Sequence, residues 1–322
     1  MVLCVCATNV NQGRIVTAKL AITCGDPAGV GPEIIASWLE ANPDEQGQVV
    51  VLGAPRWLQA LPADVPTIAV GLEEYEAKFG KPDAEGALVA LAAMERAAEG
   101  CKQGEFSGVV TGPVSKAELA KIGYAFPGQT EFFADRWSGD PVMCFCGERM
   151  RMTLVTWHVP LAEVPQLLGP KMLRRAIAAA DELARCDGVE SPRIGVCGLN
   201  PHAGERGLIG DEERNFINPT LDRLRADFPG LSGCEPGDTI FARHLRGEFD
   251  VIVALYHDQG LGPLKTMEFD TAVNVTLGLP QVRTSPDHGT AFGIAGQGKA
   301  SNLSFSNAVK VARRLIRARS GQ

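Results

Sequence analysis

The sequence lacks long apolar runs and the features of an export signal. None of the apolar stretches in its 322 residues approaches the ~18 residues that are needed to cross a bilayer. The opening segment MVLCVCATNV has no basic region, and Asn9, Asn11 and Gln12 interrupt it before any small-residue cleavage site. We therefore expect a cytoplasmic protein that is neither exported nor bound to a membrane.

An excess of basic residues is also missing. The 31 Lys and Arg residues are outnumbered by 38 Asp and Glu residues, which gives a formal net charge of -7. The only dense basic run, residues 310–319, lies near the C-terminus, and we interpret it as the solvated face of a helix. Nothing here is typical of a surface that follows nucleic-acid phosphates, so nucleic acid is not an expected partner.

The nine cysteines form neither a disulfide pattern nor a zinc pattern. Their number is odd, and no CxxC pair occurs. This usage is typical of a reducing compartment. The pairs Cys4/Cys6 and Cys144/Cys146 have a spacing of two, which places both members on one face of a strand, and we expect them to be small core residues.

Two common nucleotide-binding signatures are absent. The sequence has no G-x-x-x-x-G-K-[ST] loop and no G-x-G-x-x-G fingerprint. The loop GDPAGVGPE, residues 25–33, follows an expected strand and opens a helix at Pro32. Its backbone amides could bind an anion at the helix N-terminus, but a structural tight turn explains the loop equally well.

What the sequence does contain is a regular alternation of short β-branched runs and longer helical patterns. Hydrophobic residues make up 45% and charged residues 21%, as in an ordinary globular protein. The alternation predicts an α/β fold with a mainly parallel sheet, and the length is sufficient for two lobes. We expect helices at residues 84–99 and 170–185, and strands at residues 18–23, 49–52, 108–111, 152–156, 194–198, 251–255 and 272–276.

Three of the five histidines follow expected strands directly. His158, His202 and His257 would meet at one edge of the sheet, and three imidazole ligands with an open position are typical of a catalytic divalent metal site. The alternative is that each is a separate hydrogen-bonded core residue, and the sequence spacing does not decide between them. Asp258 could be a fourth ligand, an acceptor for His257 or a general base. We interpret His244, in an arginine-rich stretch, as a surface residue.

Three residues that flank the last expected strand could bind an anion. Lys265, Asn274 and Arg283 are spaced nine residues apart. Together their donors could hold a phosphate or a carboxylate, although each residue taken alone is more often solvated.

Six segments in this order resemble the 4-hydroxythreonine-4-phosphate dehydrogenase (PdxA) family of pyridoxal phosphate biosynthesis. They are GDPAGVGPEI, VVTGPVSKAEL, GQTEFFAD, NPHAGERGLIGDEE, YHDQGLGPLK and NVTLGLPQVRTSPDHGTAFGIAGQGKAS. The match begins near residue 19 and continues almost to the C-terminus, so residues 1–18 fall outside it. The resemblance implies an isocitrate/isopropylmalate-dehydrogenase-like fold, in which two α/β lobes enclose the active site.

The resemblance also implies the lobe boundaries and the assembly. Residues 1–130 and 272–322 would form the first lobe, which includes the nucleotide loop. Residues 131–271 would form the second lobe, with the metal ligands and the dimer interface. The expected assembly is a homodimer with the active site at the subunit interface.

Specific residues take family roles on the same basis. A divalent metal, which could be Zn, Mg, Mn or Co, would be held by His158, His202 and His257. The phosphorylated amino-acid substrate would contact Gln129, Thr130, Lys265, Asn274 and Arg283, and catalysis would involve Asp238, Asp258 and Lys265. NAD or NADP would bind at His288, Gly289, Thr290, Ala291 and Gly296.

The implied reaction oxidises 4-phosphooxy-L-threonine and decarboxylates it to 3-amino-2-oxopropyl phosphate. One position departs from the family, because Gln129 stands where a histidine is usual. Glutamine donates hydrogen bonds but carries no charge. A dehydrogenase of a phosphorylated sugar acid, such as 4-phosphothreonate or 4-phosphoerythronate, is therefore an alternative. Two further alternatives belong to other classes of enzyme. One is a phosphate acyltransferase, which would need no metal-binding histidines, and the other is a metal-dependent hydrolase, which would run without NAD(P).

Overall fold

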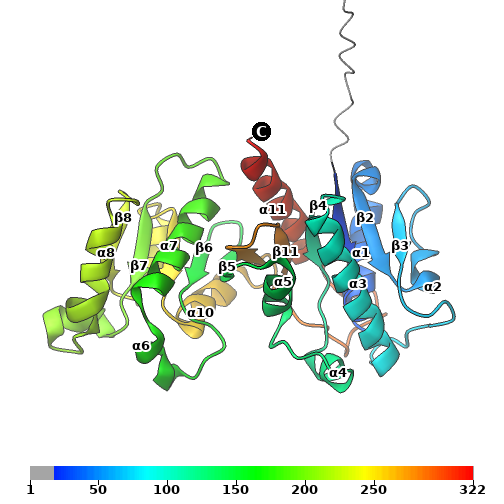
Figure 1. The fold of residues 1–322 in the computed structure, drawn as a ribbon, viewed down its shortest axis with the longest axis horizontal. Coiled ribbons are helices and arrows are strands. Elements are labelled where there is room, and N and C mark those ends of the chain that lie inside the picture. Colours follow the sequence, from blue (N-terminus) through cyan, green and yellow to red (C-terminus); the bar gives the residue numbers. More distant parts are fainter. Residues whose placement is uncertain (1–17, 322) are drawn as a thin grey trace, which may run out of the picture.

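The computed structural model describes residues 18–321, in which one continuous sheet of eleven strands runs the length of the molecule (Figure 1). The strand order is β3-β2-β1-β4-β11-β10-β5-β6-β9-β7-β8. The strands are β1 (Lys19–Thr23), β2 (Val49–Gly53), β3 (Thr67–Ala69), β4 (Phe106–Thr111), β5 (Val142–Cys146), β6 (Arg151–Leu154), β7 (Ile194–Cys197), β8 (Leu231–Glu235), β9 (Val251–Ala254), β10 (Val273–Leu277) and β11 (Arg283–Pro286).

Helices connect most of these strands, as the alternating pattern predicts. Within residues 18–321 no helix combines the length and the apolar character that crossing a bilayer requires. The α-helices are α1 (Gly31–Ala41), α2 (Pro55–Leu58), α3 (Ala84–Lys102), α4 (Lys116–Lys121), α5 (Gln129–Trp137), α6 (Val164–Leu167), α7 (Pro170–Arg185), α8 (Asn218–Leu224), α9 (Ile240–Leu245), α10 (His257–Glu268) and α11 (Leu303–Ser320). Shorter helical turns are η1 (Pro43–Gln48), η2 (Leu161–Glu163), η3 (Pro201–Gly207) and η4 (Glu213–Ile217).

The sheet is parallel at both ends and antiparallel in the middle. All seven expected strands are present, but β10 runs antiparallel to both β11 and β5, and β5 runs antiparallel to β6. The expectation of a mainly parallel sheet therefore fails at the centre. Short connections explain the antiparallel pairs β10–β11 and β5–β6. Residues 278–282 and 147–150, which connect these strands, are too few for a crossover helix.

The strands carry the core of the protein. β2 and β9 are buried along their whole length, as expected for strands whose two faces are both covered. Cys144 and Cys146 are buried in β5, which confirms their interpretation as core residues. Burial raises the pKa of the Cys146 thiol to about 12, so it stays protonated. Cys4 and Cys6 lie outside the described residues.

The interpretation of His244 as a surface residue is wrong. On α9 it shares the inner face with Ile240 at the i, i+4 spacing, and only 5% of His244 is exposed. Its Nδ1 lies 2.8 Å from the carbonyl of Phe249, and its Nε2 accepts a hydrogen bond from the Arg151 amide at 3.1 Å. The neutral ring therefore joins α9 to β6.

This burial predicts a pH-dependent stability. Burial lowers the pKa of His244 below its usual 6.5, so below pH 6.5 the unfolded chain binds a proton that the folded protein excludes. We expect the free energy of unfolding to fall as the pH drops from 6.5 to the folded-state pKa, with a slope of up to about 1.4 kcal/mol per pH unit. Urea unfolding at several pH values measures this slope. H244Q should be less stable at pH 7.5 and should show a shallower slope, and an equal slope would contradict the assignment.

Candidate active site

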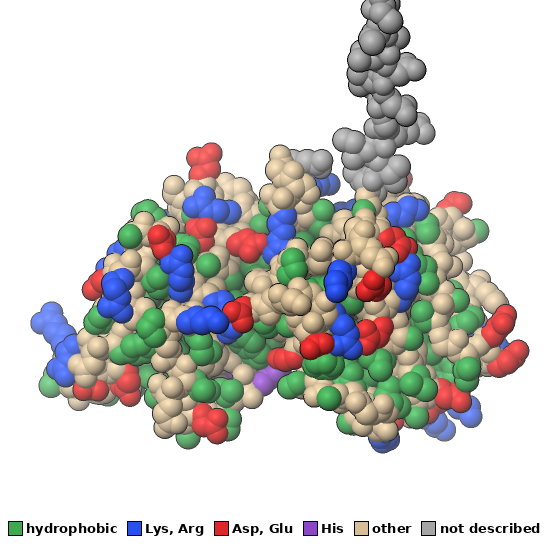
Figure 2. All heavy atoms as spheres, in the orientation of Figure 1, with side chains coloured by type: hydrophobic (Ala, Val, Ile, Leu, Met, Phe, Trp, Pro, Cys, Tyr) green, Lys and Arg blue, Asp and Glu red, His purple; other side chains and the backbone are tan. Residues whose placement is uncertain are grey.

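A cavity of about 350 Å³ lies where the two halves of the sheet meet. Its walls come from segments that are far apart in the sequence: α4 and α5, strands β5, β10 and β11, the loop after β6, and α10. On the surface seen in Figure 2, part of a histidine side chain is visible at the lower edge, between the two halves of the molecule. The polar and charged side chains that line the cavity are Lys116, Gln129, Thr130, Glu131, His158, His257, Lys265, Asn274, Arg283, Ser285, Asp287 and His288.

Arg283, the first residue of β11, is a buried cation without a carboxylate partner. Its guanidinium donates to the hydroxyls of Thr111 at 2.9 Å, Ser285 at 3.1 Å and Thr276 at 3.2 Å, while Nε has no partner. Within residues 18–321 it forms no ion pair. Burial lowers its pKa to about 10. Because an unpaired buried charge is costly, this site is suited to an anionic ligand.

Two lysines add positive charge to the same cavity. The Lys265 ammonium on α10 lies 3.5 Å from both the backbone carbonyl and the carboxylate of Asp287. Lys116 is the first residue of α4 and has no ion pair in the described part of the chain. Asn274 accepts a long, 3.5 Å hydrogen bond from Arg283. The structure thus brings Lys265, Asn274 and Arg283 together.

His158 and His257 face each other across this cavity. Their ring centroids are 5.8 Å apart. Burial, with a smaller effect from Lys116, lowers the pKa of His158 and favours the neutral imidazole that binds metals. Asp258, whose side chain is 92% exposed, lies 2.7 Å from Nδ1 of His257. This contact orients the ring and leaves Nε2 available as a ligand.

His202 does not lie with the other two. It lines a different cavity beside η4 and α8, together with Arg206 and Arg214. Residues 202–206 have consecutive positive φ angles, which produces a left-handed turn, and Leu208 just beyond it is 84% exposed. Among residues 18–321, no three His, Cys, Asp or Glu side chains come close enough together to hold a metal ion. One chain therefore assembles two of the three predicted ligands.

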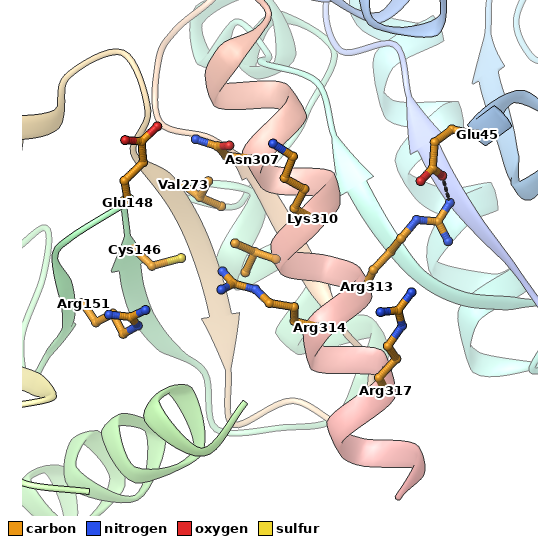
Figure 3. A pocket seen from close by; sticks show the side chains of 12 residues that line it. Glu45, Cys146, Glu148, Arg151, Val273, Asn307, Lys310, Arg313, Arg314 and Arg317 are labelled. Atoms are coloured by element: carbon orange, nitrogen blue, oxygen red, sulfur yellow. Dashed lines mark hydrogen bonds and ion pairs between the residues drawn. The ribbon is translucent and has the colours of Figure 1, made fainter. Parts of the chain in front are cut away.

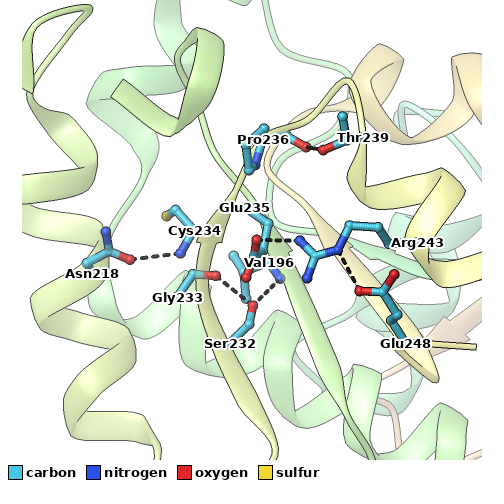
Figure 4. Close-up of polar contacts among 10 residues, drawn as sticks. All are labelled: Val196, Asn218, Ser232, Gly233, Cys234, Glu235, Pro236, Thr239, Arg243 and Glu248. Atoms are coloured by element: carbon cyan, nitrogen blue, oxygen red, sulfur yellow. Dashed lines mark hydrogen bonds and ion pairs between the residues drawn. The ribbon is translucent and has the colours of Figure 1, made fainter. Parts of the chain in front are cut away.

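Asp238 also lies outside the cavity. It is exposed in the connection between β8 and α9, which Figure 4 shows from close by. The contacts around this connection are structural: Arg243 donates to Glu235 at 2.5 Å and to Glu248 at 2.8 Å. In this arrangement Asp238 has no contact with the cavity.

The first turn of α5 supplies hydrogen-bond acceptors, one of which is a carboxylate. The Gln129 amide donates from Nε2 to the carbonyl of Gly112 at 3.1 Å, which leaves Oε1 buried without a partner. Glu131 accepts from Trp157 through Oε1 and has a buried, unpartnered Oε2. Thr130 between them is buried. These oxygens would accept hydrogen bonds from a hydroxyl or ammonium group of a ligand.

The predicted nucleotide loop borders the cavity at one end only. His288 and Gly289 line it. Further along, the Thr290 carbonyl accepts from the Val30 amide at 2.9 Å, Ala291 has a positive φ of 44°, and the Gly296 amide donates to Glu33 at 2.8 Å. The loop is thus held against the beginning of α1.

The GDPAGVGPE segment forms a tight turn that is bonded largely within the protein. The amides of Asp26, Ala28, Gly29 and Val30 all donate to acceptors within the protein. Gly31 is required for close packing, because a Cβ there would lie 2.2 Å from the carbonyl oxygen of Cys24. These four amides are therefore already bonded and not free to bind a phosphate, which favours the structural turn.

Sequence reasoning missed four polar residues of the cavity, Lys116, Glu131, Ser285 and Asp287. Lys116 and Glu131 belong to quoted segments, VVTGPVSKAEL and GQTEFFAD, and each lies in the first turn of a short helix. Lys116 could have been predicted from its position shortly after a strand, since β4 ends at Thr111. No comparable signal indicates Glu131.

Comparisons with known proteins agree with this geometry. The family model of the pyridoxal phosphate biosynthetic protein PdxA matches residues 32–312. The chain is 41% identical over 304 residues to 4-hydroxythreonine-4-phosphate dehydrogenase of Zymomonas mobilis, covering 87% of this chain and 90% of that protein. The corresponding protein of Aromatoleum aromaticum is 42% identical over 316 residues, covering 92% and 96%.

Solved structures show the same fold. The crystal structure of 4-hydroxythreonine-4-phosphate dehydrogenase from Klebsiella pneumoniae aligns with a TM-score of 0.81 and 34% identity, covering 93% of this chain and 99% of that one. Isocitrate dehydrogenase from Methylococcus capsulatus aligns with a TM-score of 0.51 at 14% identity over 94% of this chain and 88% of that one, which supports the expected isocitrate-dehydrogenase-like fold alone. Matched along most of its length, the chain belongs to the family of the pyridoxal phosphate biosynthetic protein PdxA.

Proposed function

We propose that this protein oxidises 4-phosphooxy-L-threonine with NAD or NADP and decarboxylates the product to 3-amino-2-oxopropyl phosphate. The observation that carries the proposal is the buried, unpaired guanidinium of Arg283 in a cavity that also holds Lys116 and Lys265. A substrate with a phosphate and a carboxylate supplies the missing negative charge. The names of the relatives point to the same substrate.

In the proposed reaction, some residues of the cavity bind the substrate and another transfers a proton. Arg283, Asn274 and Lys116 bind the anionic groups of the substrate. The amine of Lys265, in its unprotonated form, would accept the hydroxyl proton while hydride leaves for the nicotinamide. The bond to the carboxylate then breaks, CO₂ departs, and a proton returns to the carbon that carried it. Lys265 is better placed for this role than Asp258, which is exposed and bonded to His257.

A divalent metal, which could be Zn, Mg, Mn or Co, fits the imidazoles of His158 and His257, which lie together in the cavity. It would supply positive charge beside the alcohol oxygen and the ketone formed from it. His202 lies in a separate cavity of the same chain, so we propose that the third ligand is His202 of a second copy in a homodimer. The free cysteines of the described residues support a cytoplasmic location.

The test incubates the protein with 4-phosphooxy-L-threonine, NAD or NADP, and added divalent metal. Absorbance of the reduced cofactor measures the reaction with and without a chelator. We expect chelator-sensitive reduction, with release of one CO₂ per cofactor reduced. No reduction with this substrate would overturn the proposal. Acyl transfer without metal would instead indicate an acyltransferase, and hydrolysis without NAD(P) a hydrolase.

A dehydrogenase of a phosphorylated sugar acid is the second candidate. The neutral amide of Gln129 favours it, because its free Oε1 can accept a hydrogen bond from a substrate hydroxyl as readily as from an ammonium. Reduction of the cofactor with 4-phosphothreonate or 4-phosphoerythronate alone would establish this candidate.

A further inference from the structure

A second cavity lies on the opposite face of the sheet from the candidate active site. It has a volume of about 460 Å³, and α11 forms one wall while the β5–β6 hairpin forms the other (Figure 3). The two cavities share strands: Phe145 and Asn274 line the active site, and their neighbours Cys146 and Val273 line the second cavity. This follows from the alternation of side chains along β5 and β10.

The lining of this second cavity is basic although the protein is acidic. Four of the cations lie on α11 at spacings of three and four residues, so they share one side of the helix. Glu45 and Glu148 are the lining carboxylates, and Asp187 lies close by as an ion-pair partner. The five lining cations are Arg151, Lys310, Arg313, Arg314 and Arg317.

The carboxylates neutralise only part of this charge. Arg313 turns toward Glu45 and pairs with it, while Arg151 and Arg314 share the carboxylate of Asp187. Three carboxylates thus stand against five cations, in a chain whose net charge is -7. A hollow with such a surplus concentrates positive potential.

Two cations in particular are available to a ligand. Lys310 and Arg317 form no ion pair in the described part of the chain. Arg314, between them, has a buried Nε without a hydrogen-bond partner. In Figure 3 the side chains of Lys310 and Arg314 extend from α11 toward the strand that carries Cys146, with Glu148 and Arg151 on the far side. The basic run is therefore not only a solvated face.

We propose that this second cavity binds a small phosphate-bearing anion, held by Lys310, Arg314 and Arg317. The volume suits a small molecule. Guanidinium groups bind phosphate oxygens in pairs, and an ammonium adds a point charge. Phosphomonoesters and diphosphates share this chemistry. The site is separate from the candidate active site and does not depend on the proposed reaction.

The test is calorimetric titration of the full chain with inorganic pyrophosphate and, separately, with glycerol phosphate. Since the active site also attracts anions, the R283M variant, which lacks the buried guanidinium there, serves as the background in which that binding is weakened. In R283M we expect one remaining anion site. The added substitutions K310Q and R317Q should weaken it about tenfold each, because each removes a charge-assisted hydrogen bond. Tighter binding of pyrophosphate or of the monoester tells which phosphate class the site takes.

The control variant removes the same number of positive charges at positions away from the cavity. Lys102 and Arg246 are exposed and form no ion pair among the described residues, so K102Q/R246Q lowers the net charge equally without touching the cavity. This control should bind as tightly as R283M alone. The proposal is overturned if R283M retains no anion site, if K310Q/R317Q binds as before, or if the control loses as much affinity. Lys310 and Arg317 are exposed, so equal melting temperatures should exclude misfolding.

Discussion

Replacing Arg283 by methionine lowers kcat/KM for the phosphorylated substrate by about thirtyfold to several thousandfold. The change removes the buried guanidinium that lacks a carboxylate partner in the described chain and would pair with the substrate. Losing one member of a buried charge pair costs about 2–5 kcal/mol, and each 1.4 kcal/mol corresponds to about a factor of ten. Steady-state kinetics measure the loss.

The stability of the same variant separates binding from folding. Without ligand, Arg283 is an uncompensated buried cation, so R283M should melt at the same temperature as the wild type or higher. R283K should recover little activity, because an ammonium does not reproduce the forked donors that reach Thr111, Thr276 and Ser285. The control R246M changes an exposed arginine and should keep full activity. Kinetics of R283M within a few-fold of the wild type would show that Arg283 does not bind the substrate.

H158A and H202A should each be almost inactive, with losses of about a thousandfold and lower metal content. His158 lies in the cavity, whereas His202 lies in another cavity of the same chain. If His202 acts on the second copy, a heterodimer of the two variants contains one intact site and one site that lacks both histidines. A random mixture should then recover about a quarter of the wild-type activity.

Co-expression of the two variants and assay of the purified mixture provide this measurement. Mixing H158A with H257A is the matched control, because both residues lie in one cavity and no intact site can form. Recovery in the first mixture and none in the second supports a shared site. No recovery in either mixture would place His202 within its own chain or outside the reaction.

The anion-binding residues could be predicted from sequence because they flank strands. Lys265, Asn274 and Arg283 lie on α10, β10 and β11, which share one edge of the cavity, and a short segment of chain connects them. Glu131 could not be predicted in this way, since it enters the cavity through the packing of α5 against α3 and its contact with the distant Trp157. Tertiary contacts of this kind leave no periodic signal.

Other failures have equally specific causes. β5 and β11 were not expected, because they pair through antiparallel hairpins in the centre of a sheet that otherwise alternates with helices. His244 was misplaced because its arginine neighbours suggested an exposed helix, while the inner face of α9 is defined by spacing from Ile240. Under our proposal His202 acts in the active site of a second copy, and a single sequence contains no direct signal of subunit contacts.

The hydrogen bonding between β4 and β11 is the narrowest junction of the eleven-stranded sheet near the active site. Only two residue pairs join these strands, whereas five join β10 to β5. Arg283 belongs to this junction, and its guanidinium reaches across it to Thr111 on β4. Under our proposal an anion held by Arg283 would connect the two halves of the sheet, and we expect the protein to be mechanically stiffer with substrate bound and more compliant after the product has left.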